Sequence, residues 1–168
     1  TMDVGDFITG EMKDTTAGNI DQTEKLFHRY HGAGDGRIQI WFGMRQVMTC
    51  SRELIEAIAV RSKELGTGVH GHLCEHKDEV AFCLEKYHQR PVEFLYDVGL
   101  LAENFTAAHC VLLSEHDIRL MAERRVNVVH CPNANLGAHG FPKTPDLFEE
   151  GISIGLGNDG ASVGGLSH

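Results

Sequence analysis

Four short segments that carry histidine, aspartate or asparagine each follow an apolar run in the second half of the chain. They are His72-Leu73-Cys74-Glu75, Ala107-Ala108-His109-Cys110, His130-Cys131-Pro132-Asn133 and Gly157-Asn158-Asp159-Gly160. Each apolar run has the length of a buried strand, so each segment falls where a strand ends and a loop begins. The carboxyl ends of parallel strands meet at one edge of a sheet. The pattern therefore favours an α/β fold with polar side chains gathered at that edge.

Strand and helix patterns alternate along the chain after an irregular N-terminal segment, residues 1–18. We expect helices capped by Asn19 and Ser51, because both residues precede apolar stripes of helical period. Short connections between alternating elements predict parallel strands with right-handed crossovers. The expected strands are 37–43, 67–73, 105–110, 126–131 and 152–157, and the expected helices are 20–31, 51–65, 76–88, 91–101, 114–124 and 143–150.

The length of the chain limits the architecture. A closed (β/α)8 barrel of the TIM type takes about 250 residues, whereas this chain has 168. The sequence contains no linker or composition shift that would divide it. We therefore expect one α/β domain over residues 1–168, equivalent to the later portion of a barrel.

Charge and cysteine usage exclude some partners. The net charge of -9 argues against binding to nucleic acid or to an anionic membrane surface. No apolar run approaches the ~20 residues of a membrane span. The number of cysteines is odd, five, which favours reduced thiols and a cytoplasmic location over a disulfide framework.

The strand-end side chains are of the types that bind metal and move protons. Imidazole and carboxylate groups suit zinc and, with similar geometry, iron, and a bound divalent metal lowers the pKa of its water to about 7. His72 and Asp159, with His109 nearby, could hold such a metal. Each residue alone has a simpler explanation, since a strand-end histidine is often structural and Asn-Asp-Gly is often a turn. The occurrence of all four segments in order favours the metal site.

The same segments carry a resemblance to a known family. His72-x-x-Glu75, Ala-Ala-His109-Cys, Val-His130-Cys-Pro-Asn-Ala-Asn135 and Gly-Leu-Gly-Asn-Asp159-Gly-Ala-Ser162 resemble the amidohydrolase superfamily, in its branch of metal-dependent deaminases and chlorohydrolases. The resemblance covers roughly residues 37–165. It implies a (β/α)8 barrel in which these motifs follow the fifth to eighth strands, so that the chain supplies about strands 4–8.

The resemblance also implies roles, position by position. His72 and Asp159 match metal ligands, and His109 matches the sixth-strand histidine beside the metal and the attacking water. Asp159 also matches the base, and Glu75 the acid that protonates a ring nitrogen of the substrate. The seventh-strand loop is expected to contact substrate through His130, Asn133 and Asn135. Cys131 departs from the pattern, because asparagine is common there.

The implied activity is hydrolytic deamination of an aminated heterocycle, of purine, pyrimidine or triazine type, by metal-activated hydroxide. One zinc or iron ion is implied for each complete site, with a small molecule as substrate. An alternative within the same chemistry is hydrolysis of an amide or a carbon–halogen bond.

A further alternative is a non-catalytic fragment. Only 71 residues precede His72, so the first-strand His-x-His motif of the family cannot lie at its usual place. The N-terminal barrel strands and the small β-domain of such enzymes are expected to be missing too. An open parallel sheet exposes edge strands, which favours a homo-oligomer.

Overall fold

A computed structural model describes residues 2–3, 14–138 and 140–160 of the protein. Five strands form one sheet in the order β1-β2-β3-β4-β5, and every neighbouring pair is parallel. The strands are β1 (Phe42–Met44), β2 (Val69–Leu73), β3 (Phe105–His109), β4 (Asn127–His130) and β5 (Ile154–Leu156). This arrangement confirms the predicted α/β class and all five expected strands.

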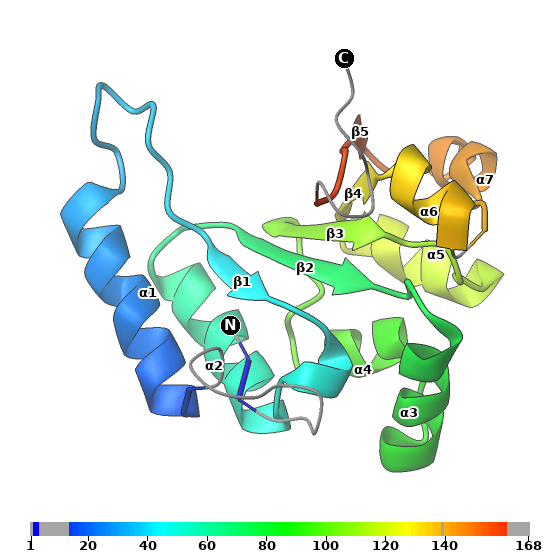
Figure 1. Ribbon diagram of the computed structural model, residues 1–168, viewed down its shortest axis with the longest axis horizontal. Coiled ribbons are helices and arrows are strands. Elements are labelled where there is room, and N and C mark those ends of the chain that lie inside the picture. Colours follow the sequence, from blue (N-terminus) through cyan, green and yellow to red (C-terminus); the bar gives the residue numbers. More distant parts are fainter. Residues whose placement is uncertain (1, 4–13, 139, 161–168) are drawn as a thin grey trace.

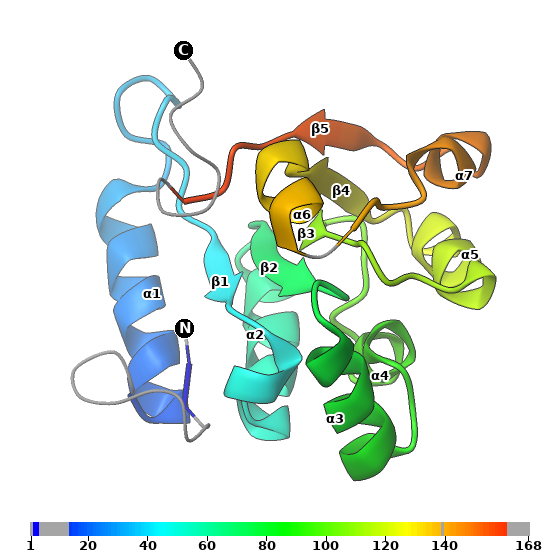
Figure 2. The same cartoon turned by 45° about the vertical axis from the view of Figure 1, so that its right-hand side comes forward.

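Helices connect the strands and cover one side of the sheet. Figures 1 and 2 show α2 to α5 along that side, with α1 packed beside α2. The helices are α1 (Thr16–Tyr30), η2 (a 3-10 turn, Val47–Thr49), α2 (Arg52–Glu64), α3 (Lys77–Tyr87), α4 (Pro91–Asp97), α5 (Glu115–Glu123), α6 (Pro132–Ala138) and α7 (Thr144–Glu149).

The core lies between the sheet and these helices. Phe42, Val69 and Phe105 on the strands are at most 1% exposed, as are Leu54 and Ile58 on α2. Burying a side chain of this size contributes about 1.5–3 kcal/mol, so this layer holds the strands at fixed spacing. Among the described residues, no helix is both long and apolar enough to cross a membrane.

Local chemistry explains where helix boundaries agree with the sequence. The Ser51 hydroxyl accepts a hydrogen bond from the Leu54 amide, which is the predicted N-cap of α2. Asn19, in contrast, is not a cap. Helix α1 begins at Thr16 because the Thr15 hydroxyl accepts from the Gly18 amide. Asn19 is buried inside the helix, where its side-chain amide donates to the Met2 carbonyl.

Other boundaries differ because tertiary contacts override the pattern. Strand β1 is shorter than the predicted 37–43, since a turn pairs the Ile38 amide with the Ala33 carbonyl and side chains bind both backbone groups of Ile40. Helix α4 ends before residue 101 because Gly99 follows with a φ of +77°. Helix α6 was not predicted at all.

Candidate active site

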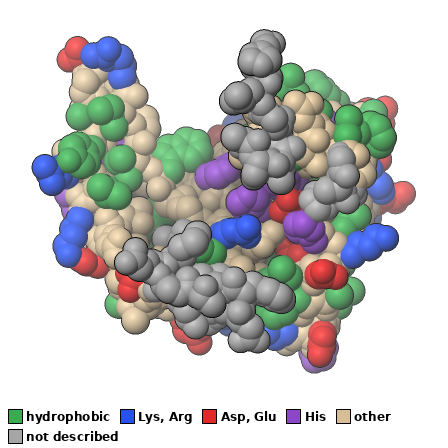
Figure 3. All heavy atoms as spheres, in the orientation of Figure 1, with side chains coloured by type: hydrophobic (Ala, Val, Ile, Leu, Met, Phe, Trp, Pro, Cys, Tyr) green, Lys and Arg blue, Asp and Glu red, His purple; other side chains and the backbone are tan. Residues whose placement is uncertain are grey.

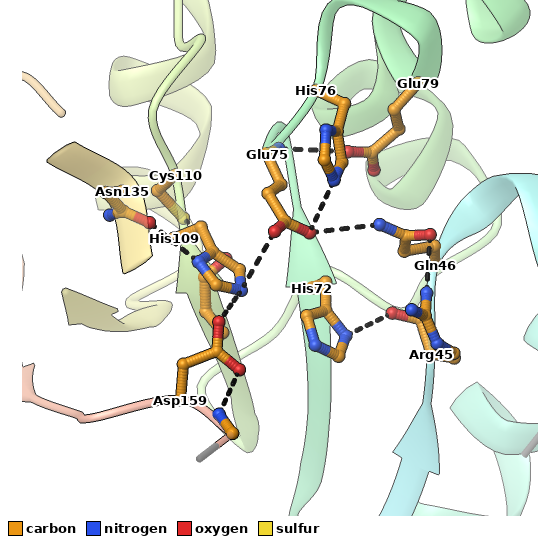
Figure 4. A network of polar contacts seen from close by, with 12 residues as sticks. Arg45, Gln46, His72, Glu75, His76, Glu79, His109, Cys110, Asn135 and Asp159 are labelled. Atoms are coloured by element: carbon orange, nitrogen blue, oxygen red, sulfur yellow. Dashed lines mark hydrogen bonds and ion pairs between the residues drawn. The ribbon is translucent and has the colours of Figure 1, made fainter. Parts of the chain in front are cut away.

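The carboxyl edge of the sheet brings together side chains from the loop after β2, the end of β3 and the loop after β5. Glu75, His109 and Asp159 each place one ligand atom within 4.8 Å of the others. His109 Nε2 lies 3.7 Å from Glu75 Oε1 and 3.9 Å from Asp159 Oδ2. Figure 4 shows the two carboxylates approaching the same imidazole nitrogen from two different loops. Figure 3 shows histidine, acidic and basic side chains gathered in the middle of this face.

Several residues at this edge of the sheet have a left-handed backbone conformation, which sets the direction of the neighbouring side chains. Cys74, His109, Cys110 and Asp159 have φ values of 50°, 72°, 54° and 60°. Non-glycine residues seldom adopt this region, and such strain gathers at functional sites. In the sheet register His109 lies opposite Leu73, and His72 lies opposite Ala108. Strand alternation alone would therefore place the two histidine rings on opposite faces. The turn at His109 ends the alternation and brings its ring to the face of His72.

His72 lies beside this group without belonging to it. Its ring stacks on the His109 ring, with centroids 5.2 Å apart and planes inclined by 15°. Its Nδ1 donates to the Arg45 carbonyl oxygen at 2.6 Å. A carbonyl oxygen only accepts hydrogen bonds, so the Nδ1 of His72 carries the proton and Nε2 is the nitrogen with a lone pair. Partial burial lowers the pKa of His72 and favours this neutral form.

Glu75 is 8% exposed, and neighbours fix its carboxylate. The Gln46 amide donates to Glu75 Oε2 at 3.1 Å, and His76 Nε2 lies 3.3 Å from the same oxygen. The other oxygen, Oε1, is the one that faces His109. Arg45 Nη1 in turn donates to Gln46 Oε1 at 2.7 Å. The loop after β1 thus holds both Glu75 and His72.

Behind Glu75 lies a second, wholly buried acid. Glu79 Oε2 accepts from the Glu75 amide at 3.1 Å, while Glu79 Oε1 has no hydrogen-bond partner in the described part of the chain. Burial raises the pKa of Glu79 to about 7, because the charged form is poorly solvated there.

The predicted substrate residues lie at the end of β4 and in the segment after it, in three different settings. Asn135 is 0% exposed, with its side-chain oxygen 2.9 Å from His109 Nδ1 and its nitrogen 3.2 Å from His130 Nδ1. His130 is half-buried, and burial lowers its pKa. Asn133 is exposed and donates to Asn158 Oδ1 at 3.5 Å. Residues 161–162, the end of the last predicted motif, lie outside the described residues.

The path of the loop that carries Asp159 depends on a small residue. A Cβ atom on Gly157 would stand 2.7 Å from Val129 Cγ1 and 3.0 Å from Cys131 Sγ. These separations are too short for a real carbon atom. Glycine at 157 therefore lets the loop that carries Asp159 pass close to β4.

The sequence reasoning missed three residues of this site: Arg45, Gln46 and Glu79. The signal for the first two was present, because they follow an expected strand just as the four motif segments do. Neither is a common metal ligand, so residue type does not single them out. Glu79 lies in the first turn of α3, where its side chain accepts from the Glu75 amide.

The donor set fits a divalent metal. Bonds of about 2.0–2.2 Å from zinc to nitrogen and oxygen allow two ligands of one ion to stand about 4 Å apart at most. The separations of 3.7 and 3.9 Å around His109 Nε2 fall within that limit. One imidazole and two carboxylates are also hard and borderline donors of the kind that zinc and iron accept.

A parallel sheet with this polar carboxyl edge defines an α/β-barrel type of protein with a candidate metal centre. The chain belongs to the amidohydrolase family, whose model matches residues 4–167. This confirms the family resemblance found in the sequence motifs.

Similar proteins extend this assignment. A 5-methylthioadenosine/S-adenosylhomocysteine deaminase of Desulfitobacterium hafniense is 40% identical over 147 residues, which cover 87% of this chain and 33% of that protein. The zinc complex of the atrazine chlorohydrolase TrzN from Arthrobacter aurescens has a TM-score of 0.91 at 22% identity, over 98% of this chain and 38% of that one. A zinc-bound adenosine deaminase from Xanthomonas campestris has a TM-score of 0.87 at 28% identity, over 94% of this chain and 36% of that one.

These matches also define what part of a protein the chain represents. It spans about a third of the length of the curated relative, and its fold is that of part of the barrel in the solved structures. The expected later portion of a TIM-type barrel is thereby confirmed as a partial barrel.

Proposed function

We propose that this chain supplies the catalytic edge of a metal-dependent hydrolase that deaminates an aminated heterocycle. The convergence of Glu75, His109 and Asp159 within 4.8 Å carries the proposal, since it joins donors from one strand end and two loops that are far apart in sequence. Names of relatives favour a purine substrate of the adenosine type. Pyrimidine and triazine rings are the other members of the class.

The metal assignment follows the chemistry of the donors. We assign His72, His109 and Asp159 as ligands of one divalent ion, zinc or iron, and the zinc-bound relatives favour zinc. The Arg45 carbonyl keeps the proton of His72 on Nδ1, so that Nε2 is available as a ligand. Glu75 is the competing ligand, because it groups more tightly with His109 than His72 does. When bound, the ion would make a water molecule acidic enough to lose a proton near neutral pH.

The proton transfers fall to the two carboxylates. Asp159, whose side chain is 23% exposed, takes a proton from the attacking water as the new carbon–oxygen bond forms. Glu75 donates a proton to a ring nitrogen, so that the ring accepts the electron pair of the attacked carbon–nitrogen double bond. Breaking the exocyclic carbon–nitrogen bond then releases ammonia, which leaves with the proton that Asp159 had taken. The second proton of the water leaves the new hydroxyl group as it becomes a carbonyl, and its transfer to Glu75 restores the carboxylic acid. The Gln46 contact holds Glu75 Oε2 and leaves Oε1 toward the site.

Substrate contacts are assigned to the last residue of β4 and the segment after it. His130 is half-buried and Asn133 is exposed, so both are accessible to a small molecule. The complete burial of Asn135 favours an orienting role over the substrate contact expected from the motif.

A second candidate is hydrolysis of a carbon–halogen or amide bond by the same groups. The structural similarity to a chlorohydrolase makes the carbon–halogen bond the stronger of the two. Glu75 favours deamination, since its natural use is proton donation to a ring nitrogen.

The experiment uses the full-length enzyme that contains this chain, with adenosine derivatives, guanine, cytosine, amino-triazines and chloro-triazines as substrates. Ammonia release supports deamination, and chloride release supports the alternative. Asp159→Asn should lower kcat by about 10²–10⁴-fold, the usual range for loss of a general base. Asp146→Asn, on the exposed surface of α7, is the matched control and should retain activity. Normal turnover by Asp159→Asn would refute the role of Asp159.

We propose a reducing, cytoplasmic location, because the five cysteines form no disulfide within the described part of the chain. We propose a small-molecule substrate, no nucleic-acid or membrane partner, and a homo-oligomer, in which the missing N-terminal strands and a small β-domain complete the protein. Size-exclusion chromatography with light scattering, on the chain and on the full-length enzyme, tests the assembly. A chain that holds no metal by itself would support the non-catalytic alternative for the isolated fragment.

A further inference from the structure

Asn135 joins two histidines of the site through opposite ends of its amide. Its side-chain oxygen lies 2.9 Å from His109 Nδ1, and its side-chain nitrogen lies 3.2 Å from His130 Nδ1. It comes from α6, the helix that directly follows β4, and its side chain is completely buried. Buried amides keep a fixed orientation when both ends are hydrogen-bonded.

The two ends of an amide impose different proton positions on the two rings. The amide oxygen only accepts, so His109 Nδ1 carries a proton and donates it. The amide nitrogen only donates, so His130 Nδ1 is unprotonated and accepts. His109 then presents its lone pair at Nε2, the atom that faces Glu75 and Asp159. His130, when neutral, carries its proton on Nε2.

We propose that Asn135 is a positioning residue that fixes opposite tautomers in His109 and His130. One tautomer gives His109 a lone pair toward the candidate metal centre, and the other makes His130 Nε2 a hydrogen-bond donor. A substrate that contacts His130 Nε2 would then have to offer an acceptor, such as a ring nitrogen or a hydroxyl oxygen. The inference rests on the proposed function only where it connects His109 with a metal and His130 with a substrate.

The tautomers can be measured without activity. In the metal-free protein labelled with ¹⁵N, long-range ¹H–¹⁵N spectra distinguish a protonated ring nitrogen from an unprotonated one. We expect a protonated Nδ1 on His109 and a protonated Nε2 on neutral His130. The reverse assignment on either ring would overturn the proposal, and this measurement needs no variant.

Two variants distinguish the effects of the amide oxygen and the amide nitrogen of Asn135. Asn135→Asp keeps an acceptor for His109 but loses the donor to His130, so only the His130 proton should move to Nδ1. Asn135→Leu removes both partners, so both rings should lose their preference for one tautomer. The control is Asn127→Asp, which changes an amide at the amino end of β4. It should leave the tautomers of both rings unchanged. Unchanged tautomers of His109 and His130 in Asn135→Leu would overturn the proposal.

Zinc titration distinguishes this inference from the proposed function. If His109 binds zinc, Asn135→Leu should weaken zinc affinity by about 10–100-fold, as loss of a hydrogen bond to a ligating histidine does. The predicted tautomer changes with unaltered zinc affinity would support the positioning role and contradict the assignment of His109 as a ligand.

Discussion

The two ends of the parallel sheet differ in how their polar groups are satisfied. At the amino end, the Asn104 amide donates to the Thr67 carbonyl at 2.9 Å and to the Ser62 hydroxyl at 3.2 Å. A cavity of about 630 Å³ lies there, with these three residues in its wall. At the carboxyl end, buried Glu79 has one oxygen without a partner among the described residues, and His109 adopts a left-handed backbone.

This difference shows that a large cavity does not by itself mark the reactive site. The amino end has space, but its amide, hydroxyl and carbonyl groups satisfy one another, which is the arrangement of a structural region. The carboxyl end combines backbone strain with a perturbed buried acid, and both gather where chemistry is done. In α/β barrels the carboxyl end carries function and the amino end carries stability.

The largest effect is expected from Glu75→Gln in the full-length enzyme. Glutamine keeps the shape and can still accept from Gln46, but it cannot donate a proton to the substrate ring. We expect kcat to fall by about 10²–10⁴-fold with little change in the free energy of unfolding. Steady-state kinetics and urea unfolding measure the two quantities.

A matched variant at the opposite end is Glu103→Gln. Glu103 is exposed and pairs with Arg125 at 3.0 Å, and an exposed ion pair of this kind contributes at most about 1 kcal/mol. Its kcat should equal that of the unmodified enzyme. Equal losses of activity in both glutamine variants would remove the distinction between the two ends.

The second prediction concerns pH and the buried acid Glu79. Burial raises its pKa from 4.5 to about 7 in the folded protein, so the folded state holds a proton that the unfolded state has released. Its contribution to stability is therefore complete below about pH 4.5 and is lost as pH rises through 7. The pKa difference corresponds to at most about 3 kcal/mol.

Glu79→Gln should flatten this pH dependence, since glutamine does not titrate. The check is the free energy of unfolding of the metal-free protein between pH 4.5 and 8, measured in urea. Glu85→Gln, an exposed position on the same helix α3, should retain the slope of the unmodified protein. Parallel profiles for Glu79→Gln and the unmodified protein would show that folding does not raise the pKa of Glu79.

The sequence predicted which residues lie at the carboxyl end of the sheet better than it predicted how they are oriented there. In β2, Val69, Gly71 and Leu73 alternate with two histidines, whereas β3 is mostly apolar. Both patterns predict strands, and the residues at their carboxyl ends were the natural candidates. The left-handed backbone of His109 could not be read from the pattern, because it depends on how the chain turns into the next loop. Strand alternation alone places His109 on the face of Phe105 and Ala107, away from the face of His72.

The amino end was predicted least well. Residues 37–41 have strand composition, yet the His31 ring and the Thr67 hydroxyl bind the backbone of Ile40 and replace the strand ladder. Such contacts join residues that are distant in sequence, so no local sequence pattern predicts them. Gln46 was missed for a related reason: its importance comes from a contact with Glu75, 29 positions further along the chain.

The smallest effect is expected from Asn104→Leu, which tests the structural role of the amino end. The substitution removes two hydrogen bonds and leaves the Thr67 carbonyl without this donor, which should lower the free energy of unfolding by about 1–3 kcal/mol. Urea unfolding should show a lower midpoint with an unchanged slope. Because Asn104 lies at the far end of β3 from His109, kcat per folded molecule of the full-length enzyme should stay unchanged. A fall in kcat of the folded variant would show that the amino end also shapes the catalytic edge, and the functional division between the two ends would then be wrong.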